Sequence, residues 1–76
     1  MTPTPVHRLT ERQKDVVIAI RTFWEMHGYG PTHRELAYIL QLSLQRIAQL
    51  LNALRVAGVV AWNDGKARTI RLVVRT

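Results

Sequence analysis

The stretch GPTHRELAYILQLSLQRIAQLLNALRVAG, residues 30–58, decides the fold because it contains two helical patterns in direct succession. Thr32 and Glu35 form a capping box, in which the two side chains satisfy unpaired amide groups at a helix start. Ser43 is a favourable N-cap for the second helix, and Gly58 stands where a glycine commonly ends one. The stretch therefore predicts a helix of about two turns, a tight turn and a longer helix.

Apolar residues recur along both helices at helical spacing, which places an apolar stripe on one face of each. These residues are Leu36, Ala37 and Leu40 in the first helix, and Ile47, Leu50, Leu51 and Leu54 in the second. The turn between them falls at Gln41 and Leu42. Two helices joined by such a turn are typical of a helix-turn-helix unit, whose second helix can enter the major groove of DNA.

A further helix precedes this unit. Thr10 and Gln13 form another capping box, and apolar residues then repeat at helical spacing as far as Gly28. Before it, Pro3 and Pro5 favour an extended arm over residues 1–9. The apolar positions of this helix are Val16, Ile20, Phe23 and Trp24.

After Gly58 the apolar period changes from about 3.6 to about 2, in the segments VVAWN and ARTIRLVV. Asp64 and Gly65 between them are typical of a type I′ turn. We therefore predict an α+β, mainly α fold: a winged helix-turn-helix over residues 10–76, with three helices and a C-terminal two-stranded β-hairpin as the wing.

The composition narrows the class of protein. The 76 residues allow one domain with a small core. Eleven Lys and Arg against five Asp and Glu give a net charge of +6, which attracts nucleic acid, anionic membranes or acidic proteins. The absence of cysteine excludes disulfides and favours a reducing compartment, so we expect a cytoplasmic location. No apolar stretch approaches the roughly 20 residues of a membrane span.

Motifs of enzymes and metal sites are absent from the sequence. There is no nucleophile elbow, P-loop or HExxH motif, and GYGP lacks the third glycine of a dinucleotide site. His7, His27 and His33 lack the spacing of helical metal ligands and have no cysteine partners. We expect no enzyme activity, no metal, no cofactor and no small-molecule ligand.

The outer face of the second helix in the stretch carries the residues that can read bases. Gln and Asn pair with adenine edges, Arg pairs with guanine, and Leu touches a thymine methyl group. The alternative is an ordinary solvated face, but such a face usually mixes both charges, and no Asp or Glu occurs over residues 36–63. The predicted base-contact residues are Leu44, Gln45, Arg46, Gln49 and Asn52.

Residues on either side of this face are candidates for contact with the DNA backbone. Thr32 and Ser43 are helix caps first, and their helix starts also bring backbone amides towards phosphate. Arg12, Arg34 and Arg55 either hold the backbone or are solvated surface charges.

The wing carries polar and basic residues around its tip: Asn63, Lys66 and Arg68. They can lie along phosphates, or Arg68 can enter the minor groove. The alternative is that these charges keep an exposed strand edge soluble.

The segments LTERQ, GYGPTHRELA, LRVAGVV and ARTIRLV resemble the N-terminal DNA-binding domain of LexA-type repressors, a winged helix-turn-helix, over residues 9–73. The segment between Leu40 and Leu54 is one residue shorter than in LexA, and its spacing is closer to that of MarR-like winged helices. The resemblance therefore does not carry over the LexA operator. A chain of this length has no room for the LexA peptidase domain, so self-cleavage is not expected.

The resemblance and the residue pattern together predict a sequence-specific regulator that binds double-stranded DNA, a repressor that acts by promoter occlusion at the nucleoid. We expect a homodimer on a palindromic operator, because one module reads only a short site. The alternative is a winged-helix protein-interaction module, such as an antirepressor or a polymerase-binding factor, that uses Leu44 and Leu50.

Overall fold

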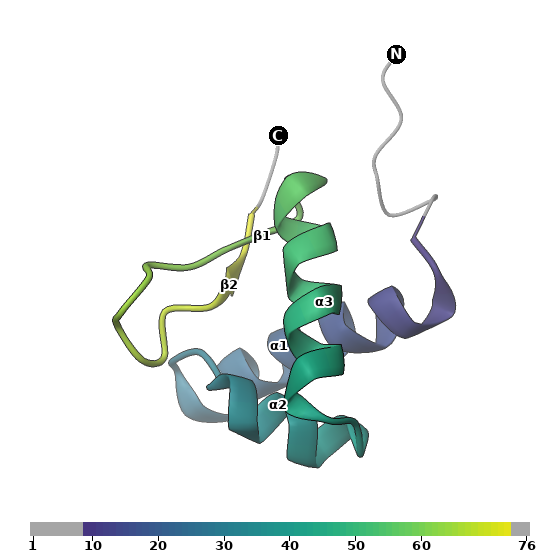
Figure 1. The fold of residues 1–76 in the computed structure, drawn as a ribbon. Coiled ribbons are helices and arrows are strands. Elements are labelled where there is room, and N and C mark those ends of the chain that lie inside the picture. Colours follow the sequence, from purple (N-terminus) through teal and green to yellow (C-terminus); the bar gives the residue numbers. More distant parts are fainter. Residues whose placement is uncertain (1–8, 74–76) are drawn as a thin grey trace.

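The computed structural model describes residues 9–73, which form three helices and a two-stranded antiparallel sheet (Figure 1). The predicted α+β, mainly α architecture and the order of its elements are confirmed. The helices α2 and α3 follow one another across a short turn, and the wing flanks α3. The elements are α1 (Glu11–His27), α2 (His33–Leu40), α3 (Leu44–Val56), β1 (Val60–Ala61) and β2 (Arg71–Leu72).

Each helix begins at the residue that the sequence predicts. The hydroxyl groups of Thr10, Thr32 and Ser43 each accept a hydrogen bond from the backbone amide three residues later, at 3.0–3.1 Å. The side chains of Gln13 and Glu35 in turn accept hydrogen bonds from the backbone amides of Thr10 and Thr32, at 2.9 and 2.8 Å, which completes two capping boxes. These contacts fix the starts of all three helices.

The ends of α2 and α3 use the left-handed backbone conformation. Gly58 has φ of 80°, and the amide of Val59 donates to the Leu54 carbonyl at 2.9 Å, a Schellman arrangement. Gln41 adopts φ of 58° at the end of α2, although it is not glycine. Its side-chain amide donates to the Tyr38 carbonyl at 2.9 Å and so helps to hold the sharp turn into α3.

The core lies between the three helices and the start of the wing, and α3 contributes most to it. Fully burying one such aliphatic side chain stabilises the fold by about 1.5–3 kcal/mol. Trp24, an apolar position of α1, is partly buried against the core, and its Nε1 donates to the Ile70 carbonyl at 2.8 Å. The buried residues are Val16, Ala19, Ile20, Leu36, Ile47, Leu50, Leu51, Leu54, Val60 and Ile70.

The predicted type I′ turn is wrong. That turn requires positive φ at both central residues, and only Gly65, with φ of 80°, has it. The strands pair Val60 with Leu72 and Ala61 with Arg71, which places the middle of the connection at Lys66. Between the strands the chain forms a loop instead of a tight hairpin.

Side chains give this loop its shape. The Thr69 hydroxyl accepts from the Asn63 amide at 2.9 Å and lies 3.1 Å from the Lys66 carbonyl, so it bridges both arms of the loop. Gly30, in the connection between α1 and α2, packs directly beneath the loop, because a Cβ atom there would collide with the Ile70 carbonyl oxygen. The loop is therefore seated on the helices.

The predicted arm falls mostly outside the described residues; its last residue, Leu9, is partly buried against the core. None of the helices over residues 9–73 has the length and apolar character needed to cross a membrane. In the same part of the chain, no three His, Asp or Glu side chains gather closely enough to hold a metal ion.

Candidate nucleic-acid interface

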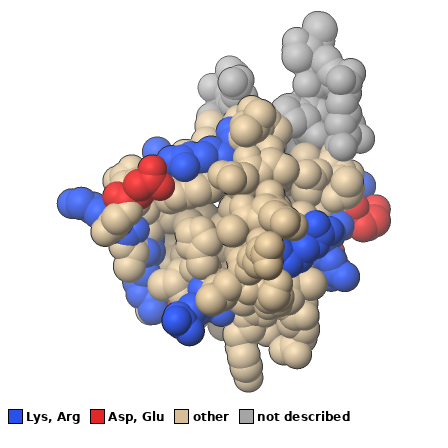
Figure 2. Space-filling view, viewed as in Figure 1, with Lys and Arg blue, Asp and Glu red and all other residues tan. Residues whose placement is uncertain are grey.

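The outer face of α3 presents the residues predicted to contact bases. Leu44, Gln45, Arg46, Gln49 and Asn52 are all exposed, while the opposite face of the helix is buried. Figure 2 shows an uncharged strip along the middle of this face, with Lys and Arg side chains on both sides of the strip. The alternative prediction, a protein-interaction module that uses Leu44 and Leu50, is wrong for Leu50. This residue is 5% exposed, so it belongs to the core and cannot contact another protein.

The polar side chains of this face have no partners within residues 9–73. Hydrogen bonds and ion pairs in that part of the chain involve none of the side chains of Gln45, Arg46, Gln49 or Asn52. Arg46 contributes only its backbone amide, which is capped by Ser43. The donors and acceptors of the face are therefore available to an external ligand.

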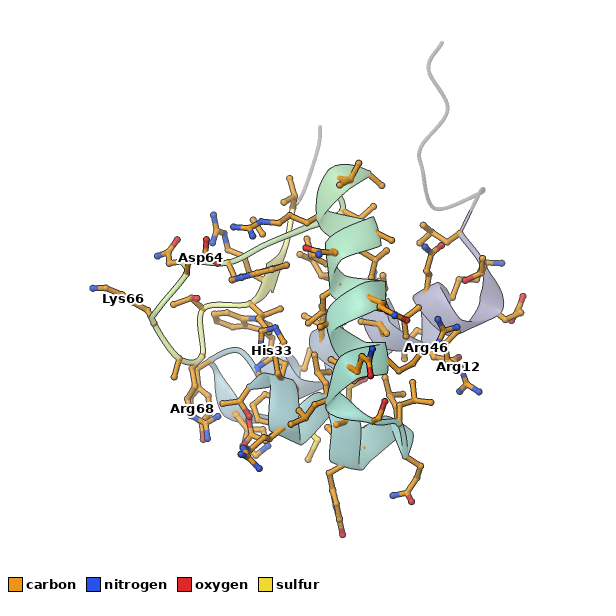
Figure 3. All side chains as sticks on the ribbon, in the orientation of Figure 1. Arg12, His33, Arg46, Asp64, Lys66 and Arg68 are labelled. Carbon is orange, nitrogen blue, oxygen red and sulfur yellow. The ribbon has the colours of Figure 1, made fainter. Side chains whose placement is uncertain are left out.

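Basic residues lie on both sides of α3 (Figure 3). Arg12 of α1 and Arg46 of α3 appear on the side away from the wing, and Lys66 marks the tip of the wing on the other. Arg12 also forms an exposed ion pair with Asp15 at 3.5 Å, which leaves it accessible. The positive charges are therefore spaced across the face instead of being gathered at one point.

A hollow of about 360 Å³ separates the start of α2 from the wing. It brings together residues that the sequence places in two separate groups, Thr32 and Arg34 of the helix-turn-helix and Lys66 and Arg68 of the wing. His33 also lines it, with its ring 5.9 Å from the Trp62 ring. A concave surface lined by basic side chains and a helix start is suited to an anionic group.

Residues 6–69 match the family model of the LexA DNA binding domain. The chain belongs to this family. The resemblance seen in the sequence is thereby confirmed, and it covers α1, α2, α3 and most of the wing.

Several LexA repressors are similar to this chain. The LexA repressor of Thermotoga maritima is 36% identical over 64 residues, which is 84% of this chain and 32% of that protein. The LexA repressor of Thermotoga neapolitana is 40% identical over 65 residues, again 84% and 32%. That of Marinomonas sp. (strain MWYL1) is 39% identical over 69 residues, 90% of this chain and 33% of that protein. The chain spans about a third of the length of these relatives.

Two arginines of this LexA-family domain join separate elements of the protein. Arg68 forms two hydrogen bonds with the Glu35 carboxylate, at 3.0 and 2.9 Å, and its guanidinium lies 4.7 Å from the Tyr29 ring centre. The Arg68 hydrogen bond lowers the pKa of Glu35 below its usual value, and the Thr32 amide adds to that effect. The same pair raises the pKa of Arg68. DNA contact by Arg68 stays a prediction.

Arg55 forms the second cluster, at the end of α3. Its guanidinium lies 4.0 Å from the Trp62 ring centre, donates to the Trp62 carbonyl at 3.3 Å and is 3.5 Å from the Asp64 carboxylate. Asp64 also accepts from Trp62 Nε1 at 3.0 Å. Sequence reasoning assigned Asp64 to turn chemistry alone, and it missed this cluster because no local pattern pairs α3 with the wing.

The remaining predicted contacts lie at the surface. Ser43 and Asn63 are exposed and Thr32 is partly buried, and the hydroxyl groups of Ser43 and Thr32 are occupied as caps. Arg34 is exposed beside the hollow.

A second, apolar groove of about 780 Å³ lies between α1 and α2 and includes no residue of α3. Its exposed apolar residues include Ile18, Met26, Tyr38 and Ile39.

Proposed function

We propose that this LexA-family domain is a sequence-specific repressor that binds double-stranded DNA, with α3 in the major groove and the wing on the adjacent backbone or minor groove. The observation that carries the proposal is the outer face of α3, exposed, uncharged along its middle and bordered by basic residues. Family membership and the LexA repressors among its relatives support it.

The side chains of α3 have the chemistry for reading a base sequence. Arg46 can donate two hydrogen bonds to a guanine, while Gln45, Gln49 and Asn52 can pair with adenine edges. Leu44, 44% exposed on the first turn of α3, suits a thymine methyl group. These residues supply specificity, because each good base contact is worth about 1–3 kcal/mol of discrimination.

Phosphates on either side of the groove would be held by the flanks. The hollow between α2 and the wing offers Arg34, Lys66 and the amides near Thr32 to one strand. Arg12 stands on the other side of α3 for the opposite strand. Such contacts set affinity and position but carry no base information, and they weaken as salt concentration rises.

Repression would follow from occlusion of a promoter at the nucleoid. A homodimer would place two copies of α3 on successive half-sites of a palindrome, about one helical turn apart. Sedimentation of the protein with and without its site tests the dimer: one copy per palindrome would contradict it.

Selection of bound sequences from random DNA tests the function as a whole. We expect an enriched half-site of a few base pairs, repeated with two-fold symmetry. Fluorescence anisotropy with the selected site and a scrambled site at moderate salt then measures specificity. Equal affinities for the two duplexes would contradict sequence-specific binding.

A protein-interaction module is the second candidate, and the apolar groove between α1 and α2 favours it. Under this function, replacing Arg46 and Gln49 with alanine leaves partner binding intact, and DNA binding is weak and salt-driven in every variant. Under the first function, the same replacements abolish specific DNA binding.

A further inference from the structure

We propose that Arg68 is a positioning residue: through Glu35 it fixes the wing against α2 and so sets where Lys66 meets the DNA backbone. The inference rests on the proposed function, and it gives Arg68 a task other than direct contact with DNA. Three observations support it: the backbone of Arg68, the sharing of the Glu35 carboxylate and the sparse hydrogen bonding between the strands.

The backbone of Arg68 is in an unfavourable conformation that its side chain offsets. Its φ is 63°, in the left-handed region that residues with a Cβ atom rarely adopt. The conformation directs the guanidinium towards α2, where it meets both carboxylate oxygens of Glu35 and lies 3.5 Å from the Gly30 carbonyl. Such strain persists only where surrounding contacts determine it, and it often marks a functional position.

The Glu35 carboxylate serves the helix-turn-helix and the wing at once. Its Oε1 accepts from the Thr32 amide at 2.8 Å and from Arg68 Nη1 at 3.0 Å, while Oε2 accepts from Arg68 Nη2 at 2.9 Å. One carboxylate therefore caps α2 and holds the wing. Because the hydrogen bonds are parallel and bidentate, they fix direction as well as distance.

Side-chain contacts, more than strand pairing, determine where the tip of the wing lies. The strands pair over only two residues each, and the tip extends beyond them. Lys66 is exposed, and it forms no ion pair among residues 9–73. Arg68 and Asp64 each lie two residues from Lys66; Asp64 joins this part of the wing to α3, and Arg68 joins it to α2, so the position of the Lys66 ammonium relative to α2 depends on Arg68.

The first test is Glu35→Gln, measured by anisotropy on the selected DNA site. Glutamine preserves the capping box, since its amide oxygen still accepts from the Thr32 amide. The substitution removes a negative charge and releases Arg68. If Arg68 contacts DNA directly, binding to the DNA site should be unchanged or tighter. A positioning role predicts binding about fivefold weaker, from loss of the geometry. Unchanged or tighter binding overturns the proposal.

The second test is Arg68→Lys, which keeps the charge and loses the bidentate fork. Lys66→Gln is the matched control. It should reduce the magnitude of the slope of log affinity against log salt by about 0.9, because one phosphate contact is lost. We expect Arg68→Lys to reduce the magnitude of this slope by a similar amount, about 0.9. In a protein that already carries Lys66→Gln, we expect Arg68→Lys to change the affinity for DNA by less than about twofold. An unchanged slope, or additive losses, overturns the proposal.

Circular dichroism shows which variants are folded. If Glu35→Gln does not fold, the comparison of Arg68→Lys with and without Lys66→Gln tests the proposal. Equal affinity of the unaltered protein for selected and scrambled DNA overturns the proposed function. Specific binding by the unaltered protein, with no effect of either variant, overturns only the role of Arg68.

Discussion

The outer face of α3 and the wing use the same kinds of side chain in opposite ways. On α3 the backbone is fixed by helix hydrogen bonds and four buried residues, so the predicted base-contact side chains take no part in holding the fold. In the wing, regular pairing covers two residues on each strand, and side chains hold the rest: Arg68 pairs with Glu35 of α2, and Asp64 pairs with Arg55 at the end of α3. An arginine such as Arg46, whose side chain has no partner among residues 9–73, is therefore a better candidate for DNA contact than Arg55 or Arg68, which join separate elements of the protein.

The largest expected effect separates the two faces of α3. Leu51→Ala should destabilise the domain by about 2–5 kcal/mol, because Leu51 is fully buried in a small core. Gln49→Ala on the outer face is the matched control and should change stability by less than about 0.5 kcal/mol. Denaturant unfolding measures both. A comparable loss in the two variants would show that the outer face contributes to the fold.

The next effect concerns the contact between the wing and the connection from α1 to α2. Gly30→Ala should destabilise the domain by about 1–3 kcal/mol, because the new methyl group would collide with the Ile70 carbonyl oxygen. Gly28→Ala is a useful comparison, since its Cβ atom meets open space and only its φ of 79° opposes the change. Thermal unfolding distinguishes the two causes. A harmless Gly30→Ala would mean that the wing can shift without cost.

The outer face of α3 should dominate specificity. Arg46→Ala and Gln49→Ala should each weaken binding to the selected site by about 1–3 kcal/mol and relax the preference at one base pair. Arg21→Ala, an exposed arginine on α1 outside every predicted contact, matches Arg46→Ala in charge and should retain the base preference. Anisotropy with single-base variants of the site measures the change. An equal loss on all sequences would assign Arg46 to the backbone.

The smallest effect is the acid dependence of the pair between the wing and α2. Since folding lowers the pKa of Glu35, the stability that the pair contributes is complete above the ordinary glutamate pKa of about 4.5 and is lost as pH falls through the lower, folded value. Solvent screening keeps it modest, because the side chains of Arg68 and Glu35 are 41% and 34% exposed. Denaturant unfolding over this acid range should show a shallower pH dependence in Glu35→Gln. An identical pH dependence of stability in the unaltered protein and in Glu35→Gln would show that the pair of Glu35 and Arg68 does not contribute to it.

Local signals in the sequence were sufficient to predict the helices. A cap such as Ser43 acts on an amide three residues away, and the stripe that includes Leu51 follows from helix geometry alone. The change of apolar period after Gly58 predicted the wing, and the LexA resemblance agreed with it. The positions of the α3 side chains follow from the same periodicity, so the candidate base contacts lie on one exposed face as expected.

The details of the wing were not accessible in the same way. Arg68 and Glu35 are separated by 33 positions, and no periodicity links them. The pair Asp64 and Gly65 favours a type I′ turn, but Asp64 is instead held by Trp62 and Arg55. Tertiary contacts between side chains prevailed over the preference of the turn, and the left-handed backbone fell at Arg68 as well as at Gly65.

The hydrogen bond from Trp24 to the Ile70 carbonyl has a practical consequence, since the chain contains two tryptophans: Trp24 contacts the wing and Trp62 belongs to it. Trp62 lies beneath the Arg55 guanidinium, and neither indole belongs to α3. The intrinsic fluorescence of the unlabelled protein therefore comes from the junction between wing and helices. A red shift of that emission would report the wing lifting into water, independently of any signal from the nucleic acid.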